Sequence, residues 1–98
     1  MSETFDDGSQ GWPCVLSEEV TAFMIDPALP PWAMGPIVAA MVEIGEYRGL
    51  VPGSSVAEDW PECRLLPLGT DGALGIIEYV VARAANPPQV IVTRILLY

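Results

Sequence analysis

Residues 89–98 read QVIVTRILLY, and residues 76–81 read IIEYVV. Both stretches are dominated by β-branched and other apolar side chains, which is typical of strands. Between residues 69 and 72 the sequence is Gly-Thr-Asp-Gly, and Asn-Pro-Pro follows at 86–88. Both segments favour turns. The sequence therefore predicts strands over 62–68, 73–83 and 89–98, joined as a C-terminal meander, with the last strand either central in the sheet or covered on both faces.

Residues upstream of the meander predict one short strand and two helices. The run WPCVL at 12–16 predicts an edge strand, because Pro13 lacks the amide that a central strand needs. Ser17 is suited to cap a helix that ends before Pro27, and the prolines at 27, 30 and 31 make a stiff connection. A second helix follows and ends near Gly49, with Pro36 in its first turn. Its apolar stripe contains Met34, Ile37, Val38, Met41 and Ile44.

The predicted order is therefore β-α-α-β-β-β, an α+β domain with two short helices packed on one face of a small, mainly antiparallel sheet. The chain of 98 residues is long enough for one domain. We predict a flexible acidic segment over residues 1–11, a single domain over 12–98, and a surface loop over 49–61.

Both long strands carry apolar residues on both faces. In residues 76–81, Ile77, Tyr79 and Val81 alternate with Ile76 and Val80, and residues 90–97 follow the same pattern. Two short helices can cover only one face of such a sheet. Large exposed apolar patches are rare on monomers, so the second face implies a protein partner, self-association, or a sheet curled on itself.

The composition excludes several kinds of chemistry. The chain contains neither histidine nor lysine, so Ser-His and Cys-His nucleophile pairs, Schiff-base lysines and His-containing zinc sites are excluded. Cys14 and Cys63 cannot form a thiolate metal site alone, and they predict two reduced core thiols, with a single disulfide as the alternative. No cofactor and no metal is predicted.

Acidic residues are concentrated in the first two thirds of the chain. Residues 1–62 hold eleven of the thirteen acids and one of the four arginines, within a net charge of −9. Direct nucleic-acid binding is therefore not expected, because phosphate recognition needs a basic surface. Acidic clusters at Asp6–Asp7 and at Glu58, Asp59 and Glu62 favour solvated loops, as Glu43 and Glu46 favour a solvated helix face. The start of the chain is not that of a signal peptide, and no apolar run is long enough to span a bilayer, so we expect a cytoplasmic protein without a membrane association.

The element order resembles the RelE/ParE superfamily of toxin-antitoxin toxins, particularly the HigB-like branch. WPCVLSEEV at 12–20 looks like the family's opening strand and first helix, and IVAAMVEIG at 37–45 looks like its second helix. GLVPG at 49–53 falls at its Gly/Pro loop, and residues 76–82 and 90–97 look like its last two strands. The resemblance covers about residues 12–98 and implies an mRNA-cleaving toxin paired with an antitoxin.

That activity depends on basic residues that stabilise a phosphorane, with help from a tyrosine or histidine. The family's Glu-Leu-Arg signature looks like Pro67-Leu68 here, without its arginine, and no basic tail follows the last strand. The remaining catalytic candidates are Arg64, Tyr79, Arg83 and Arg94, the arginines as electrostatic clamps and the tyrosine as proton relay or stacking ring. Each also has a structural interpretation, such as pairing of Arg94 with Glu78 on the neighbouring strand.

Three functional hypotheses follow. The first is a RelE/HigB-like fold that acts by binding a partner protein, its ribonuclease site eroded. The second is an active ribosome-dependent mRNA endoribonuclease neutralised by an antitoxin. The third is an unrelated acidic binding or inhibitor protein whose residues 1–62 bind a basic surface. A phage-encoded inhibitor is one form of this hypothesis.

Overall fold

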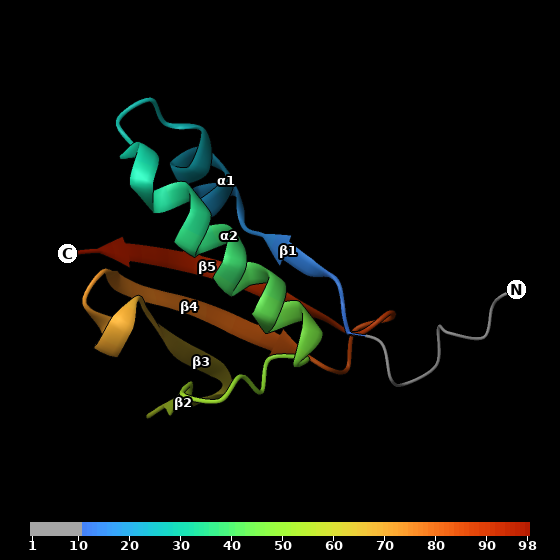
Figure 1. Ribbon diagram of the computed structural model, residues 1–98. Helices are drawn as coiled ribbons and strands as arrows, with labels where there is room; N and C mark the ends of the chain where they lie inside the picture. The colour runs from blue at the N-terminus through green and yellow to red at the C-terminus, as the bar shows by residue number, and fades with distance from the viewer. Residues whose placement is uncertain (1–10) are drawn as a thin grey trace, which may run out of the picture.

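The computed structural model describes residues 11–98, which form two α-helices and a five-stranded mixed sheet (Figure 1). The elements are β1 (Cys14–Leu16), α1 (Glu18–Ile25), α2 (Pro31–Glu46), β2 (Ser55–Ala57), β3 (Trp60–Leu68), the 3₁₀ turn η2 (Thr70–Gly72), β4 (Gly75–Ala82) and β5 (Gln89–Leu97). The predicted α+β class and the order of its elements are confirmed. The predicted flexible segment, residues 1–11, lies outside the described residues except for Gly11.

The sheet has the strand order β1-β5-β4-β3-β2. Strand β1 pairs with β5 in parallel, and the other three pairs are antiparallel. The predicted edge strand is confirmed, since β1 lies at the edge. Of the two alternatives for the last strand, the central position is confirmed, since β5 lies between β1 and β4. Strand β2 was not predicted, because it is only three residues long and lies within the Gly/Pro/Ser-rich segment expected to be a loop.

Helix α1 begins where the sequence predicts. The hydroxyl Oγ of Ser17 accepts a hydrogen bond from the amide of Val20 at 3.1 Å, and Glu18 and Glu19 occupy the first turn. Carboxylates at this end interact favourably with the partial positive charge of the helix N-terminus. Val20 is the buried residue of the helix, with 1% of its surface exposed.

Helix α2 packs through a stripe different from the predicted one. Ile37 and Ile44 are fully buried as expected, but Met34 and Val38 are 40% and 44% exposed. The side chains that complete the buried stripe are those of Ala33 and Ala40, together with Gly45. Small residues on this stripe allow the helix axis to approach the sheet closely, and the larger side chains are left at the margin. The helix starts at Pro31, so Pro36 lies in the second turn and not in the first.

The end of α2 is a Schellman motif. The amide of Gly49 donates to the carbonyl of Ile44 at 2.8 Å, and the amide of Arg48 donates to the carbonyl of Gly45 at 3.1 Å. Both Arg48 and Gly49 have positive φ, 54° and 86°. A Cβ at Gly49 would lie 2.4 Å from Cγ2 of Val81, so this position has no space for a side chain.

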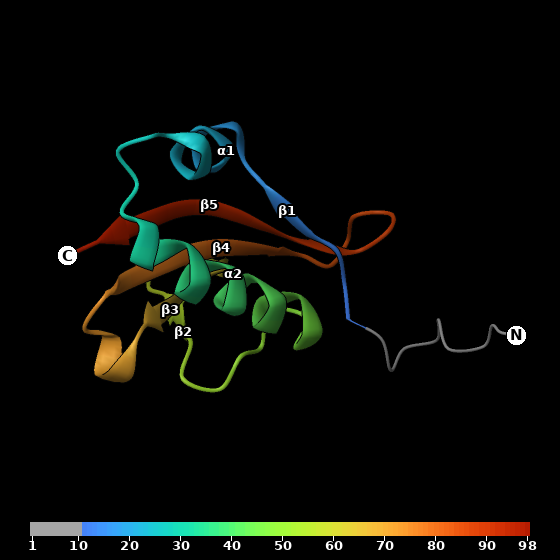
Figure 2. The ribbon, with the colours of Figure 1, turned by 45° about the horizontal axis from the view of Figure 1, so that its top comes forward.

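The helices cover one face of the sheet, with α2 crossing it and α1 lying beside β1 and β5 (Figures 1 and 2). Along β4, buried and partly exposed residues alternate strictly. The buried strand residues join the buried residues of α1 and α2 in one core cluster, which contains Leu66, Leu68, Ile77, Tyr79, Val81, Val90, Val92 and Ile95 from the sheet. The opposite face has no helix on it among residues 11–98.

Candidate functional site

The face of the sheet opposite the helices is apolar and only partly buried. Cross-strand pairs place its members side by side: Val15 with Ile91, Ile91 with Val80, Val80 with Cys63, and Ile76 with Leu96. We call this surface the open face; its apolar residues are Val15, Cys63, Leu65, Ile76, Val80, Ile91 and Leu96. Val15 and Leu96 are 40% and 47% exposed. Three interpretations of the second apolar face follow from the sequence. One of them, a sheet curled on itself, does not account for the exposure of Val15 and Leu96.

Two polar side chains occupy the centre of the open face. Glu78 on β4 is in register with Arg94 on β5, as the sequence suggested. The carboxylate of Glu78, however, accepts a hydrogen bond from the hydroxyl of Thr93, with 2.9 Å between Oε2 and Oγ1. Thr93 is available for this contact because the β4–β5 register shifts between Glu78 and Tyr79. Within residues 11–98, Arg94 makes no ion pair with Glu78.

The open face contains two shallow hollows. One, of about 130 Å³, is lined by Leu65, Ile76, Glu78, Arg94 and Leu96. The other, of about 340 Å³, extends to Trp60, whose side chain is 67% exposed at the margin of the sheet. Apolar surfaces that contain a few fixed polar groups are typical of protein interfaces, and aromatic residues are enriched in such interfaces.

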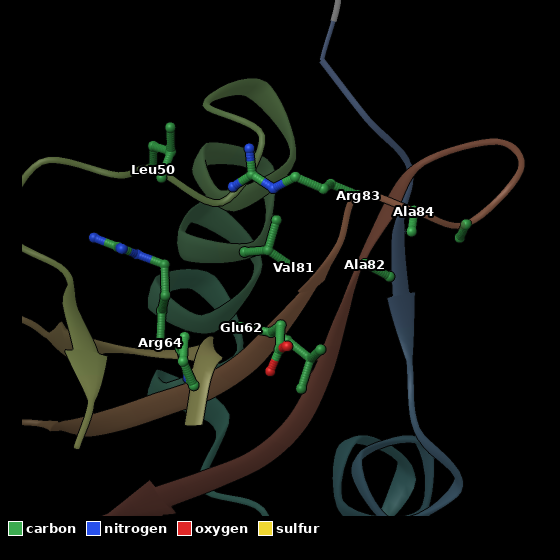
Figure 3. Close-up of a pocket in the computed structure, with 10 residues that line it drawn as sticks. Leu50, Glu62, Arg64, Val81, Ala82, Arg83 and Ala84 are labelled. Carbon is green, nitrogen blue, oxygen red and sulfur yellow. The ribbon is translucent and has the colours of Figure 1, made fainter. Parts of the chain in front are cut away.

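A separate, larger pocket of about 550 Å³ lies where β3 and β4 diverge. The β3–β4 pairing ends at Cys63 and Val80, although β4 continues to Ala82 and β3 begins earlier, at Trp60. Arg64 and Arg83 both line the pocket, together with Leu50 and Val81. Figure 3 shows the two guanidinium groups extending to the same side of the sheet, beside Leu50 and Val81. We call this site the arginine pocket.

Arg64 is held in place by the loop that follows α2. Its Nε and Nη2 atoms donate to the hydroxyl of Ser54 at 3.1 and 2.9 Å, and Nη2 also donates to the carbonyl of Ser54 at 3.4 Å. Ser54 is itself fixed, because its hydroxyl donates to the carbonyl of Val51 at 2.6 Å. Nothing in the sequence indicated Ser54 or Leu50 as parts of a site, since both lie in a segment that predicts only a loop.

Tyr79 is placed in the core and not in the arginine pocket. Its side chain is fully buried, and its hydroxyl donates to the carbonyl of Gly49 at 2.6 Å. In this arrangement the hydroxyl ties β4 to the end of α2 and does not face solvent. The four sequence-predicted site residues are therefore divided: Arg64 and Arg83 share a pocket, Arg94 lies on the open face, and Tyr79 lies beneath α2.

The two cysteines are free and partly exposed. Burial raises the pKa of the Cys14 thiol, and burial together with the charge of Glu78 raises the pKa of the Cys63 thiol. Cys14 is on β1 and Cys63 on β3, with β5 and β4 between them. Three strand spacings separate them by roughly 14 Å, whereas a disulfide needs Cα atoms within about 7 Å. The prediction of reduced thiols agrees with this placement, but the prediction that both lie in the core is wrong for Cys63: Cys14 packs against the core cluster, whereas Cys63 lies on the open face.

Residues 11–98 contain no group of three acidic, cysteine or histidine side chains that could hold a metal ion. No helix in this part of the chain is both long enough and apolar enough to cross a membrane. The chain matches no protein-family model, no curated protein and no solved structure.

Proposed function

We propose that the protein acts by binding another protein over the open face, in the cytoplasm, as a RelE/HigB-like toxin fold without a working ribonuclease site. The observation that carries this proposal is the open face, over which residues 11–98 place no helix. Seven apolar side chains from four strands lie on it, while the opposite face of the same sheet is covered by the helices and contributes to the core cluster. Covering such a surface releases water from apolar area, which is the main favourable term in protein association.

A partner of a different sequence fits this surface better than a second copy does. Each copy carries a net charge of −9, so two copies brought face to face repel one another. A neutral or basic partner avoids this repulsion. An antitoxin-like helix or strand with an apolar stripe would cover the aliphatic residues, and it could pair with Arg94 and Glu78 at the centre.

Substitution on the open face tests the proposal. Leu96→Glu adds a charge to a residue that is 47% exposed, so the domain should still fold. Val42→Glu is the matched control, because Val42 is 52% exposed on α2, away from the open face. We expect Leu96→Glu to weaken binding of the natural partner at least about tenfold and Val42→Glu to leave it unchanged. Equal effects of the two substitutions would refute an open-face interface.

The oligomeric state of the purified chain separates the partner from self-association. Sedimentation equilibrium should give a monomer of 10.5 kDa at micromolar concentration. A dimer that Leu96→Glu dissociates would show instead that the open face binds a second copy, and the proposal of a different partner would be wrong.

An active mRNA endoribonuclease is the second candidate, and the shared pocket of Arg64 and Arg83 is what favours it. Two arginines could stabilise a developing phosphorane charge. The buried hydroxyl of Tyr79 is unsuited to relay a proton to that pocket. Induced expression in a bacterium decides between the candidates. Growth arrest with codon-positioned mRNA cuts, both abolished by Arg83→Ala, would establish the nuclease, whereas normal growth with intact mRNA supports the binding function.

A third candidate is an unrelated acidic inhibitor that meets a basic surface. It is favoured by the loop between β2 and β3 and the start of β3, where Glu58, Asp59, Trp60 and Glu62 are all exposed. Replacing the three acids with Gln, Asn and Gln should weaken partner binding strongly under this candidate. The same variant should change open-face binding less than Leu96→Glu does, because Glu58 and Asp59 do not line the hollows of the open face and only Glu62 does.

A further inference from the structure

The arginine pocket lies mainly on the helix-covered side of the sheet, although Val80 of the open face also lines it. Arg64 is in register with Tyr79, whose side chain lies on the helix-covered side of the sheet, and the pocket lies at the end of that side beside Leu50. Two of the four arginines of the chain therefore line one hollow in a protein whose net charge is −9.

The two guanidinium groups keep donors for a ligand. A guanidinium carries five N–H donors, and Arg64 uses only Nε and Nη2, both toward Ser54. Its Nη1 atom and all the donors of Arg83 have no protein acceptor within residues 11–98. Glu62 also lines the pocket, but Figure 3 shows its carboxylate pointing away from both guanidinium groups. The positive charge in the pocket is thus not neutralised by its own walls.

Positioning of Arg64 makes this a built site and not a chance pair of surface side chains. Its contacts with Ser54 fix one edge of the guanidinium, so less side-chain entropy is lost when a ligand binds. Arg83 follows β4 directly and extends over Val81 toward Arg64 (Figure 3). The guanidinium of Arg64 is thus held by Ser54, and that of Arg83 remains available to bind the ligand.

The remaining walls of the pocket are aliphatic. Leu50, Val81, Ala84 and Ala85 line it, so the ligand should carry an aliphatic group beside its charge. A polyanion such as RNA is disfavoured by the net charge of the protein. A single carboxylate suits the fork of an arginine, which can donate two parallel hydrogen bonds to it.

We propose that the arginine pocket binds a carboxylate that is carried by an aliphatic group. Two sources share this chemistry: a glutamate or aspartate beside a leucine-like residue in a protein, and a free branched-chain carboxylic acid. The site does not depend on the proposed function, since its ligand need not touch the open face.

Nuclear magnetic resonance of the full-length ¹⁵N-labelled chain tests this proposal through the Nε–Hε signals of its arginines. The probes are 4-methylpentanoate and the peptide acetyl-Leu-Glu-Leu-amide, each compared with its uncharged counterpart, 4-methylpentanamide or acetyl-Leu-Gln-Leu-amide. Ionic strength is held constant, because exposed charges are screened by salt. We expect saturable shifts of the Arg64 and Arg83 signals with the carboxylates, none with the amides, and an unmoved Arg94 signal. Acetate should bind more weakly than 4-methylpentanoate, because it lacks the aliphatic group.

Arg83→Gln should weaken carboxylate binding at least about tenfold, and its exposed position should leave the fold intact. If only the peptide saturates the arginine pocket, the ligand is a protein. If 4-methylpentanoate saturates it as well, a free carboxylic acid is also a ligand. Both results support the site. Three results would overturn it: shifts that are linear or equally large at Arg94, unchanged binding in Arg83→Gln, or inorganic phosphate binding at least as tightly as the carboxylates. None of these results bears on the open face.

Discussion

Replacing Tyr79 with Phe removes one oxygen atom and tests how β4 is joined to the end of α2. The Tyr79 side chain is fully buried, and its hydroxyl donates to the carbonyl of Gly49 at 2.6 Å, across 30 positions of sequence. In Tyr79→Phe the ring remains packed, but the buried carbonyl of Gly49 loses its partner. Leaving a buried acceptor unsatisfied costs about 1–3 kcal/mol. For a domain of this size each kcal/mol lowers the melting temperature by about 4–8 °C.

Urea unfolding followed by tryptophan fluorescence measures this cost. We expect the midpoint to fall while the slope m stays constant, because the change alters stability and not the area exposed on unfolding. Tyr98→Phe is the matched control, since Tyr98 is 74% exposed. If Tyr79→Phe stays within about 0.5 kcal/mol of the wild-type free energy of unfolding, the range of ordinary surface substitutions, then the hydroxyl does not have the role assigned to it.

Four further predictions concern the backbone at the end of α2 and the two thiols. Gly49→Ala should destabilise the fold by at least about 1 kcal/mol more than Gly53→Ala does. Both positions have positive φ, but only a Cβ at Gly49 meets another atom, at 2.4 Å from Val81. Equal losses of stability in thermal unfolding would contradict this packing. Alkylation of Cys14 and Cys63 at neutral pH should be slower than that of a cysteine in an unfolded peptide, because the pKa of each thiol is raised. As the pH rises, the thiols ionise in the unfolded state before they ionise in the folded state, so their contribution to stability is complete at neutral pH and is lost in the alkaline range. Chemical denaturation in the alkaline range should show this loss of stability. The double variant Cys14→Ala, Cys63→Ala should not show it. Oxidation should give no intramolecular disulfide by mass spectrometry, and a bridged monomer would show that β1 and β3 are not separated as described.

Local chemistry predicted most of the fold. The cap at Ser17, the proline-rich connection before α2 and the Gly-Thr-Asp-Gly turn act over a few residues, so they can be recognised without tertiary information. Strands β4 and β5 were recognisable because β-branched residues are dense in them, and β3 because the Gly-Thr-Asp-Gly turn follows it. Strand β2 could not be recognised in this way, because Ser55–Ala57 is ordered by its pairing with β3 and not by its own composition.

The buried stripe of α2 shows a different limit. Ranking residues by size and hydropathy favours Met34 and Val38, yet Ala33 and Ala40 face the sheet. Which residues are buried is determined by how close the helix lies to the strands, and small residues are selected where the approach is close. That distance is a tertiary property and is absent from the periodicity of the sequence.

The candidate sites also contain one feature that local sequence predicts and others that depend on tertiary structure. The second apolar face was evident from alternation in residues 76–81 and 90–97, and the structure places no element of residues 11–98 over it. The shared pocket of Arg64 and Arg83 depends on β3 pairing with β4 only from Cys63 onward, which no local pattern encodes. The buried position of Tyr79 depends on a carbonyl 30 residues away.

Site-specific photo-crosslinking in the source cells tests the open face most directly. The crosslinking amino acid p-benzoyl-phenylalanine is placed at Leu96, on the open face, or at Val42, on the outer surface of α2, two positions with similar exposure of 47% and 52%. We expect one discrete protein adduct at Leu96 and none at Val42. The adduct should be lost when Ile76→Glu is added, and the protein identified in it should bind the purified chain. The same adducts at both positions, or adducts only between copies of this chain, would contradict a protein partner on the open face.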